Sequence, residues 1–99
     1  MMAQRLTIEQ DAAGVFLLAG PMTAEHLDYL RLFLEDDLGR AQRIALDLGG
    51  VTAVDALAVQ LLIAFRRTLP PNRDWQITRL SPELEDILVK TGLRQLLCP

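Results

Sequence analysis

The sequence predicts an α/β fold in which helices pack against a mixed four-stranded β-sheet, in the order β-β-α-β-α-β-α. Two closely spaced runs of strand length near the N-terminus, residues 6–9 and 15–19, predict a β-hairpin. An amphipathic segment separates the second run from another apolar run, residues 44–48. A strand, a helix and a second buried strand form a βαβ unit, whose strands are parallel. The 99 residues have room for one domain, residues 1–99.

The N-terminal hairpin contains a half-buried strand and a buried one. Residues 6–9 alternate between apolar and polar side chains, whereas residues 15–19 are apolar throughout. Gly14 can take a positive φ in the intervening turn, and Gly20-Pro21 is expected to stop the second strand.

The first helix is predicted over residues 23–38. Thr23 is a plausible N-cap, and Gly39 is expected to end the helix. Leucines recur at helical spacing on one face, at Leu27, Leu30, Leu34 and Leu38.

The centre of the chain predicts a buried strand followed by a buried helix. Gly49-Gly50 is expected to close the strand at residues 44–48, and Asp55 to cap a helix over residues 56–67. Because that helix is apolar almost all round, we expect it to lie largely against the sheet, with few positions left for solvent.

The C-terminal third predicts an edge strand and a helix. Trp75 and Ile77 alternate with polar residues in the strand. Ser81-Pro82-Glu83 is a strong helix start, with Ser81 at the N-cap, and Gly92 is expected to end that helix. Residues 93–97 predict a last short turn or helix that docks on the core.

Composition excludes several classes of protein. The chain is 51% hydrophobic and 23% charged with a net charge of −3, which is typical of a globular domain. Its nine arginines and one lysine are scattered between acids, so we expect no nucleic-acid partner. The longest nearly uninterrupted apolar run, residues 53–65, is too short for direct membrane insertion. With no signal-peptide pattern and a single cysteine, Cys98, we expect a cytoplasmic location.

The residue types that carry catalysis are almost absent. His26 is the only histidine and Ser81 the only serine, so neither a catalytic triad nor a histidine-rich metal site can be assembled. Cys98 lacks a neighbouring base. Asp47 and Asp55 flank the Gly-Gly pair at a spacing that could hold Mg²⁺, but no phosphate-binding loop or catalytic lysine accompanies them. We therefore expect no enzyme activity, no metal site and no cofactor.

One acidic cluster allows two interpretations. Glu35, Asp36 and Asp37 stand together at the end of the first predicted helix, where the helix dipole disfavours acids. The cluster is either a solvated helix end or a docking patch for a basic partner.

Residues 44–65, IALDLGGVTAVDALAVQLLIAF, are the most informative stretch. They resemble the central segment of STAS domains of the stand-alone bacterial type, a family named for sulphate transporters and anti-sigma factor antagonists. The family pattern is a strand ending Asp-Leu-Ser-Gly-Val and then Asp-Ser-Ser-Gly-Leu at the start of an apolar helix. Here residues 47–51 read DLGGV and residues 55–59 read DALAV. The starts and ends of the last helix, Leu80-Ser81-Pro82 and Thr91-Gly92-Leu93, agree in order and spacing.

The resemblance implies a partner-binding surface at the start of that helix. STAS domains that antagonise anti-sigma factors bind a kinase there, and phosphorylation of a serine breaks the complex. Leu57 stands at the serine position, so the resemblance implies no phosphorylation site in this chain. The partner-binding residues that it implies are Met22, Thr23, Asp55, Ala56, Leu57 and Gln60.

The resulting hypothesis is a non-catalytic protein–protein interaction module similar to anti-sigma factor antagonists and STAS adaptors. Its partner would be an anti-sigma kinase, a chemotaxis component or a transporter subunit, because Asp55 and Gln60-Leu61-Leu62 also resemble chemotaxis-linked and lipid-transport STAS proteins. The alternative is a sensor of a small ligand, nucleotide or lipid, or an accessory subunit of a lipid-transport ATPase. A sensor needs a concave site with convergent polar groups. Whether Leu57 faces a partner or the core is left open by the sequence.

Overall fold

The computed structural model describes residues 5–98 and contains one four-stranded sheet. The strands lie side by side in chain order as β1 (Thr7–Gln10), β2 (Phe16–Met22), β3 (Arg43–Val54) and β4 (Asp74–Leu80). β1 is antiparallel to β2, whereas β2, β3 and β4 are parallel to one another. The predicted mixed four-stranded α/β fold is therefore confirmed.

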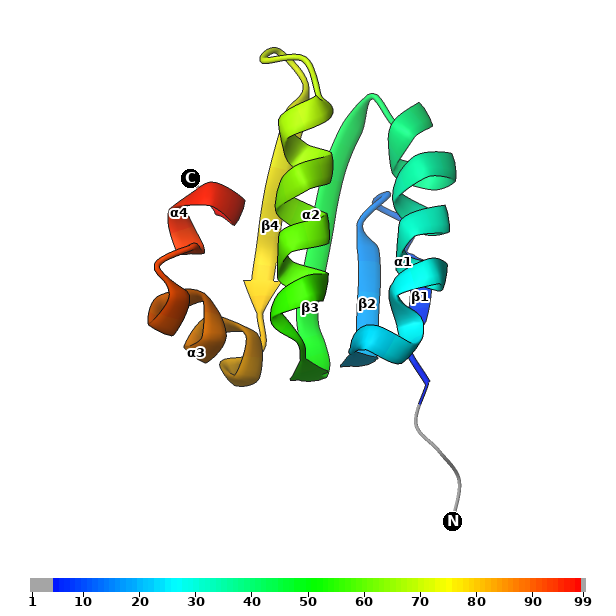
Figure 1. The fold of residues 1–99 in the computed structure, drawn as a ribbon. Helices are drawn as coiled ribbons and strands as arrows, with labels where there is room; N and C mark the ends of the chain where they lie inside the picture. Colours follow the sequence, from blue (N-terminus) through cyan, green and yellow to red (C-terminus); the bar gives the residue numbers. More distant parts are fainter. Residues whose placement is uncertain (1–4, 99) are drawn as a thin grey trace.

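Helical segments connect the parallel strands and follow the last one. Between β2 and β3 lie a 3₁₀ turn η1 (Ala24–His26), α1 (Leu27–Phe33) and a π-helical turn η2 (Leu34–Leu38). α2 (Ala56–Thr68) joins β3 to β4, and α3 (Pro82–Thr91) and α4 (Arg94–Leu97) end the described chain. α1 and α2 lie next to each other on one face of the sheet (Figure 1). Two right-handed crossovers that add strands in the same direction place both helices on the same face.

Most of the core lies between the sheet and these two helices, and Leu84 and Leu88 of α3 and Leu97 of α4 belong to the same buried cluster. Alternate residues of the central strand β3 point into it, and Leu46 is 0% exposed. The side chains between them on β3 are small or polar and partly exposed, as in Ala45 and Asp47. The inward-facing partners from the helices are Leu30, Phe33, Leu34, Leu38, Ala58, Val59, Leu62 and Ile63.

The second strand does not stop at Gly20-Pro21, contrary to the prediction. β2 continues to Met22, whose partner on β3 is Val54. The ladder between β1 and β2 ends at the pair Thr7 with Ala19, so Pro21 lies beyond the pairing with β1, where a residue without an N–H is tolerated. Gly20 has a φ of +96°, and a Cβ there would lie 2.2 Å from the carbonyl oxygen of Arg5. Glycine is required there by a close approach inside the strand.

The third strand also runs beyond its predicted end. β3 passes through Gly49-Gly50 and continues to Val54. A Cβ on Gly50 would lie 2.8 Å from Cβ of Ala19 on β2, so the missing side chain allows the two strands to approach closely. The Gly-Gly pair therefore lies inside a long strand and forms no turn.

The first helix differs from a regular helix at both ends. It begins as the 3₁₀ turn η1 and widens into the π-helical turn η2. Gly39 does not end it, because the glycine keeps right-handed helical angles of φ −60° and ψ −27°. The helical backbone continues to Arg40.

The C-terminal third follows the prediction closely. β4 is an edge strand, and Ser81 Oγ accepts a hydrogen bond from the backbone N–H of Leu84 at 3.1 Å, as an N-cap does. Gly92 ends α3 in the left-handed conformation, with φ +72°. The short predicted C-terminal helix is α4, whose Leu97 is buried.

Candidate functional site

The candidate site lies where β2 and β3 end side by side. The backbone N–H of Asp55 donates to the carbonyl oxygen of Met22 at 3.1 Å, so the pairing of the two strands extends to the residue before α2. η1 and α2 therefore begin next to each other, at the lower end of the molecule in Figure 1. The residues predicted for partner binding lie at or next to the starts of these two helical segments.

Asp55 occupies the N-cap position of α2, but its carboxylate does not cap α2, contrary to the prediction. Asp55 Oδ2 accepts a hydrogen bond from the backbone N–H of Ala24 at 2.7 Å. That N–H lies at the start of η1 and has no partner within its own turn. The carboxylate thus joins the start of one helical segment to the start of another, 31 residues later in the chain.

Thr23 is also at an N-cap position without forming the predicted cap bond. Its backbone is extended, with φ −117° and ψ 175°, but its side chain makes no bond to the helix N–H groups. Thr23 Oγ1 instead lies 3.2 Å from His26 Nδ1. The hydroxyl and the ring therefore brace η1, and this contact accounts for the only histidine of the sequence.

Leu57 projects into solvent from the first turn of α2. Its side chain is 56% exposed, and Ala56, Gln60 and Ala64 are exposed on the same helix. The expectation that α2 has few positions left for solvent is therefore wrong. Only one face of α2 is buried, and the exposed positions of its first turns carry no charge. A solvent-exposed helix face is usually rich in charged residues, so this uncharged face is unusual.

The remaining predicted site residue, Met22, is placed in the core, with only 1% of its side chain exposed. Thr23 and Asp55 are half-buried and hold the connection between β2 and η1 against α2. Ala56, Leu57 and Gln60 are the predicted site residues that are exposed to solvent. We call these three residues the α2-start surface.

A family model described as "Mlab, STAS domain" matches residues 6–98. The chain belongs to the STAS domain family. No curated protein matches the chain. STAS domains are generally non-catalytic modules that mediate protein interactions.

The resemblance noted in the sequence aligns the family's switch serine with the start of α2, which is formed here by Ala56 and Leu57. Neither side chain has a hydroxyl group. Ala58, which the resemblance aligns with a glycine of the family pattern, is fully buried. The exposure of Leu57 could not be read from the sequence, because an almost wholly apolar helix gives no period by which to identify its solvent face.

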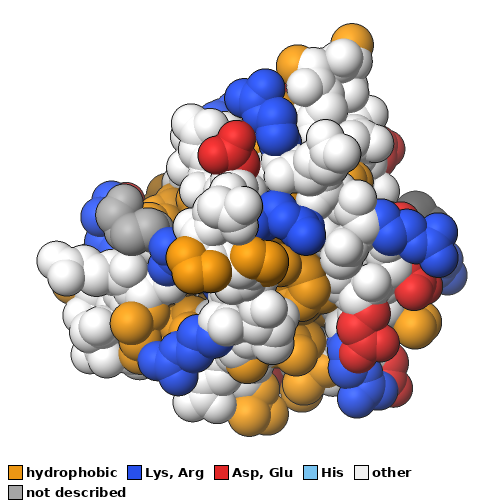
Figure 2. Space-filling model, turned by 90° about the horizontal axis from the view of Figure 1, so that it is seen from above, with side chains coloured by type: hydrophobic (Ala, Val, Ile, Leu, Met, Phe, Trp, Pro, Cys, Tyr) orange, Lys and Arg blue, Asp and Glu red, His pale blue; other side chains and the backbone are white. Residues whose placement is uncertain are grey.

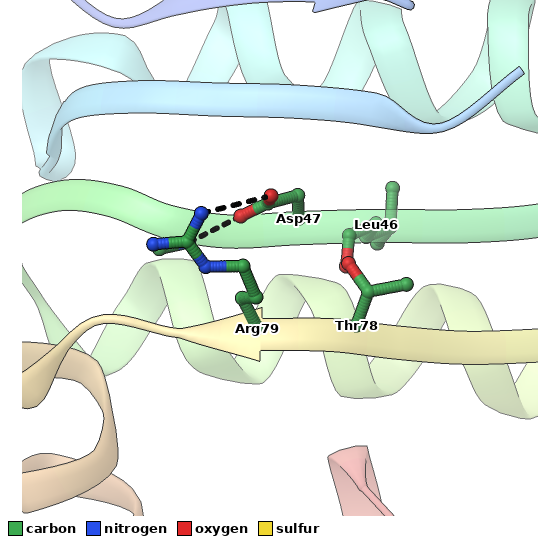
Figure 3. A network of polar contacts seen from close by, with 5 residues as sticks. Leu46, Asp47, Thr78 and Arg79 are labelled. Atoms are coloured by element: carbon green, nitrogen blue, oxygen red, sulfur yellow. Dashed lines mark hydrogen bonds and ion pairs between the residues drawn. The ribbon is translucent and has the colours of Figure 1, made fainter. Parts of the chain in front are cut away.

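Asp47 lies apart from Asp55 in this STAS domain. Its carboxylate accepts the backbone N–H of Gly49 at 2.8 Å and lies 3.8 Å from the Arg79 guanidinium (Figure 3). Next to this pair, Thr78 Oγ1 donates to the carbonyl oxygen of Leu46 at 3.2 Å. The contacts of Asp47 are structural. Within residues 5–98, no group of three or more His, Cys, Asp or Glu side chains is placed to hold a metal ion.

Cys98 lies in an environment that disfavours the thiolate. Burial raises the pKa of the Cys98 thiol, and Glu85 adds to this effect, while Arg94 and Arg66 oppose it. Because the thiolate is the nucleophilic form, a raised pKa makes the thiol a poor nucleophile at neutral pH.

Several arginines are fixed by structural contacts. Figure 2 looks onto the molecule from above and shows Lys and Arg side chains as separate groups, with hydrophobic and polar atoms between them. Arg66 donates to the carbonyl oxygen of Leu96, and Arg73 donates to that of Ala41.

Within residues 5–98, the structure contains no helix that is long and apolar enough to cross a membrane.

Proposed function

We propose that this STAS domain is a non-catalytic protein–protein interaction module of the anti-sigma antagonist and adaptor type. Its partner contacts the α2-start surface, with Leu57 as the central apolar contact. The observation that carries the proposal is the 56% exposure of Leu57 on an uncharged helix face. A large apolar side chain on a helix face without charges offers a contact that a partner can bury.

The segment that connects β2 to η1 lies next to the start of α2 and holds the α2-start surface in place. Asp55 bonds to Ala24, Thr23 contacts His26, and Met22 is buried below them. These bonds fix the start of α2 relative to η1 before any partner arrives. A surface that is already ordered loses little conformational freedom on binding, which favours affinity.

We propose that partner binding is regulated differently here than in STAS domains whose switch serine is phosphorylated. A phosphate adds a charge of about −2 and breaks an apolar contact by repulsion and desolvation. Since Ala56 and Leu57 cannot accept a phosphate, we propose that this contact is not regulated by phosphorylation at the usual position. The chain then acts as a constitutive scaffold or adaptor in the cytoplasm.

The resemblance to STAS proteins leaves three classes of partner for this surface: an anti-sigma kinase, a chemotaxis component and a transporter subunit. If the chain is an accessory subunit of a lipid-transport ATPase, it would use the same exposed helix start. That alternative is therefore a variant of the proposal, and identifying the partner would distinguish the two. All three classes present protein surfaces, and none requires a cofactor bound to this chain.

A site-specific crosslinking experiment tests the proposal. A photoreactive amino acid replaces Leu57 in one variant and Val89 in another, and each is expressed in the native host and irradiated. Val89 is the matched control, because it is an exposed apolar residue on α3, with 63% of its side chain exposed. We expect position 57 to crosslink to a protein of one of the three classes, identified by mass spectrometry.

The pattern of crosslinks decides the outcome. The proposal predicts a crosslink from position 57 and a weaker one or none from position 89. Equal crosslinking from both positions, or a co-purifying partner that does not crosslink from position 57, would contradict the proposed surface.

A further inference from the structure

A groove runs between the edge strand β1 and helix α1. Two hollows of about 620 and 220 Å³ share Ile8 and Tyr29 and so form one continuous depression. Its floor is apolar, formed by Ile8, Tyr29, Leu32 and Phe33. We call this depression the β1–α1 groove. It shares no residue with the α2-start surface.

The floor of the β1–α1 groove exposes apolar area on a rigid base. Tyr29 is 47% exposed and Leu32 is 56% exposed. Phe33 beneath them is buried and packs edge-to-face on Phe16 of β2, with ring centroids 5.2 Å apart. Two large apolar side chains held side by side on a packed base are suited to bury an apolar side chain of another molecule.

One wall of the groove is a strand with a free edge. Within residues 5–98, β1 pairs with β2 only, so alternate backbone N–H and C=O groups of β1 point away from the sheet. Thr7 and Glu9 line the larger hollow together with Ile8. Their side chains point to the face of the strand opposite to that of the Ile8 side chain. The depression therefore reaches around to the edge of β1, where a further strand could pair.

The rim of the groove is acidic. The lining residues include the carboxylates of Glu9, Glu25, Asp36 and Asp37, against the guanidinium group of Arg5. A second copy of this chain would bring like charges together, and such contacts are unfavourable. A basic segment would instead meet opposite charges on both sides of the apolar floor.

We propose that the β1–α1 groove binds an extended basic segment of a protein partner. The segment adds as a strand along β1, places an apolar side chain on Tyr29 and Leu32, and directs lysine or arginine side chains to the acidic rim. Asp36 and Asp37 are then part of a docking surface. The proposal does not rest on the proposed function, because the groove and the α2-start surface have no residue in common, and it gives the domain a second contact.

The test uses a short lysine-rich peptide with a single leucine at its centre, so that lysines leave both faces of the added strand, titrated into the ¹⁵N-labelled full chain and followed by NMR. Two control peptides carry glutamate in place of lysine, or proline in place of the central leucine. We expect the lysine peptide to shift the amide signals of β1 and α1 and to bind less tightly as salt is raised. The glutamate peptide should not bind, and the proline peptide should bind weakly because proline cannot pair as a strand.

Matched variants locate the contact. Leu32→Ser should weaken peptide binding about tenfold, whereas Val89→Ser, which alters an apolar residue on α3 that is at least as exposed, should leave it unchanged. Asp36→Asn combined with Asp37→Asn should weaken binding and reduce its salt dependence. Leu57→Asp should leave binding unchanged, so a failure of this proposal is distinguishable from a failure of the proposed function.

Four results would overturn the proposal. These are no binding of the lysine peptide, equal binding of the glutamate or proline peptide, equal binding by the Leu32→Ser variant, and shifts confined to other elements. Sedimentation of the free chain completes the test, since a dimer that Leu32→Ser dissociates would show that a second copy occupies the groove.

Discussion

A leucine stands at position 57, in the helix turn that the resemblance aligns with the phosphorylatable serine of some STAS domains. Its side chain is exposed, so a kinase that approached this turn would meet a methyl group and no hydroxyl. Thr52, an exposed residue near the end of β3, is the hydroxyl closest in sequence to the turn. The identity of residue 57 was evident from the sequence, but its exposure required the structure.

We predict that a cognate anti-sigma kinase adds no phosphate to the chain in the presence of ATP, as measured by intact mass. Leu57→Ser is the control, because it supplies the missing hydroxyl and shows that the kinase is active on this helix start. A stoichiometric phosphate on Thr52 of the unmodified chain would mean that the switch has moved to that residue and is not absent.

Cys98 provides a residue-scale test of its surroundings. Since burial raises the pKa of its thiol, the folded chain holds the proton to a higher pH than an unfolded chain does. Alkylation by iodoacetamide should therefore be slow at neutral pH and should accelerate at a higher pH than for the same chain in denaturant. Equal pH profiles for the folded and denatured chain would contradict this environment.

At the scale of the element, glycine and aspartate were the residues whose roles the sequence could not decide. Gly20-Pro21 and Gly49-Gly50 have the composition of turns, yet both pairs lie inside strands. Glycine, which has no Cβ, occurs both in turns and where two backbones approach closely. Only the position of the neighbouring strand distinguishes these two roles. Asp55 likewise has the composition of a cap, but its carboxylate satisfies an N–H of another segment. Ser81 was predicted correctly because an N-cap depends on local sequence alone.

Gly20→Ala and Gly92→Ala form a matched pair at this scale. Both glycines have a positive φ, which costs alanine about 1 kcal/mol, but only Gly20 lies against another segment. We expect Gly92→Ala to lower the free energy of unfolding by about 1 kcal/mol and Gly20→Ala by at least about 2 kcal/mol. Urea unfolding measures both. Equal losses would show that Arg5 does not approach Gly20 as the structure has it.

At the scale of the whole molecule, the sheet and the order of its elements could be predicted from hydrophobic patterning. Apolar runs at residues 15–19 and 44–48, separated by an amphipathic helix, allow little besides a βαβ unit. The pattern could not show which face of α2 is exposed, since that depends on how α1 and the sheet surround the helix. The β1–α1 groove was unpredicted for the same reason: its residues come from two elements that only the tertiary fold brings together.

The position of β3 at the centre of the fold predicts a large effect of charge in that strand. Leu46 is fully buried there, and an unpaired buried carboxylate costs several kcal/mol, so Leu46→Asp should prevent folding. Leu46→Ala should remain folded but lose about 2–5 kcal/mol of stability, measured by urea unfolding. A Leu46→Asp variant that melts cooperatively near the temperature of the unmodified chain would contradict this placement.

The same substitution at Leu57 tests the central claim most directly, by thermal melting together with the affinity for the partner recovered by crosslinking. Because the side chain is exposed and an acid in the first turn suits the helix dipole, Leu57→Asp should leave the melting temperature nearly unchanged. It should weaken the complex by about thirtyfold or more, equivalent to about 2 kcal/mol. Leu57→Ala, which removes the contact without adding charge, should weaken the complex less. A fall of about ten degrees in the melting temperature would instead show that Leu57 supports the core. Unchanged affinity with an unchanged melting temperature would show that the partner does not contact this residue.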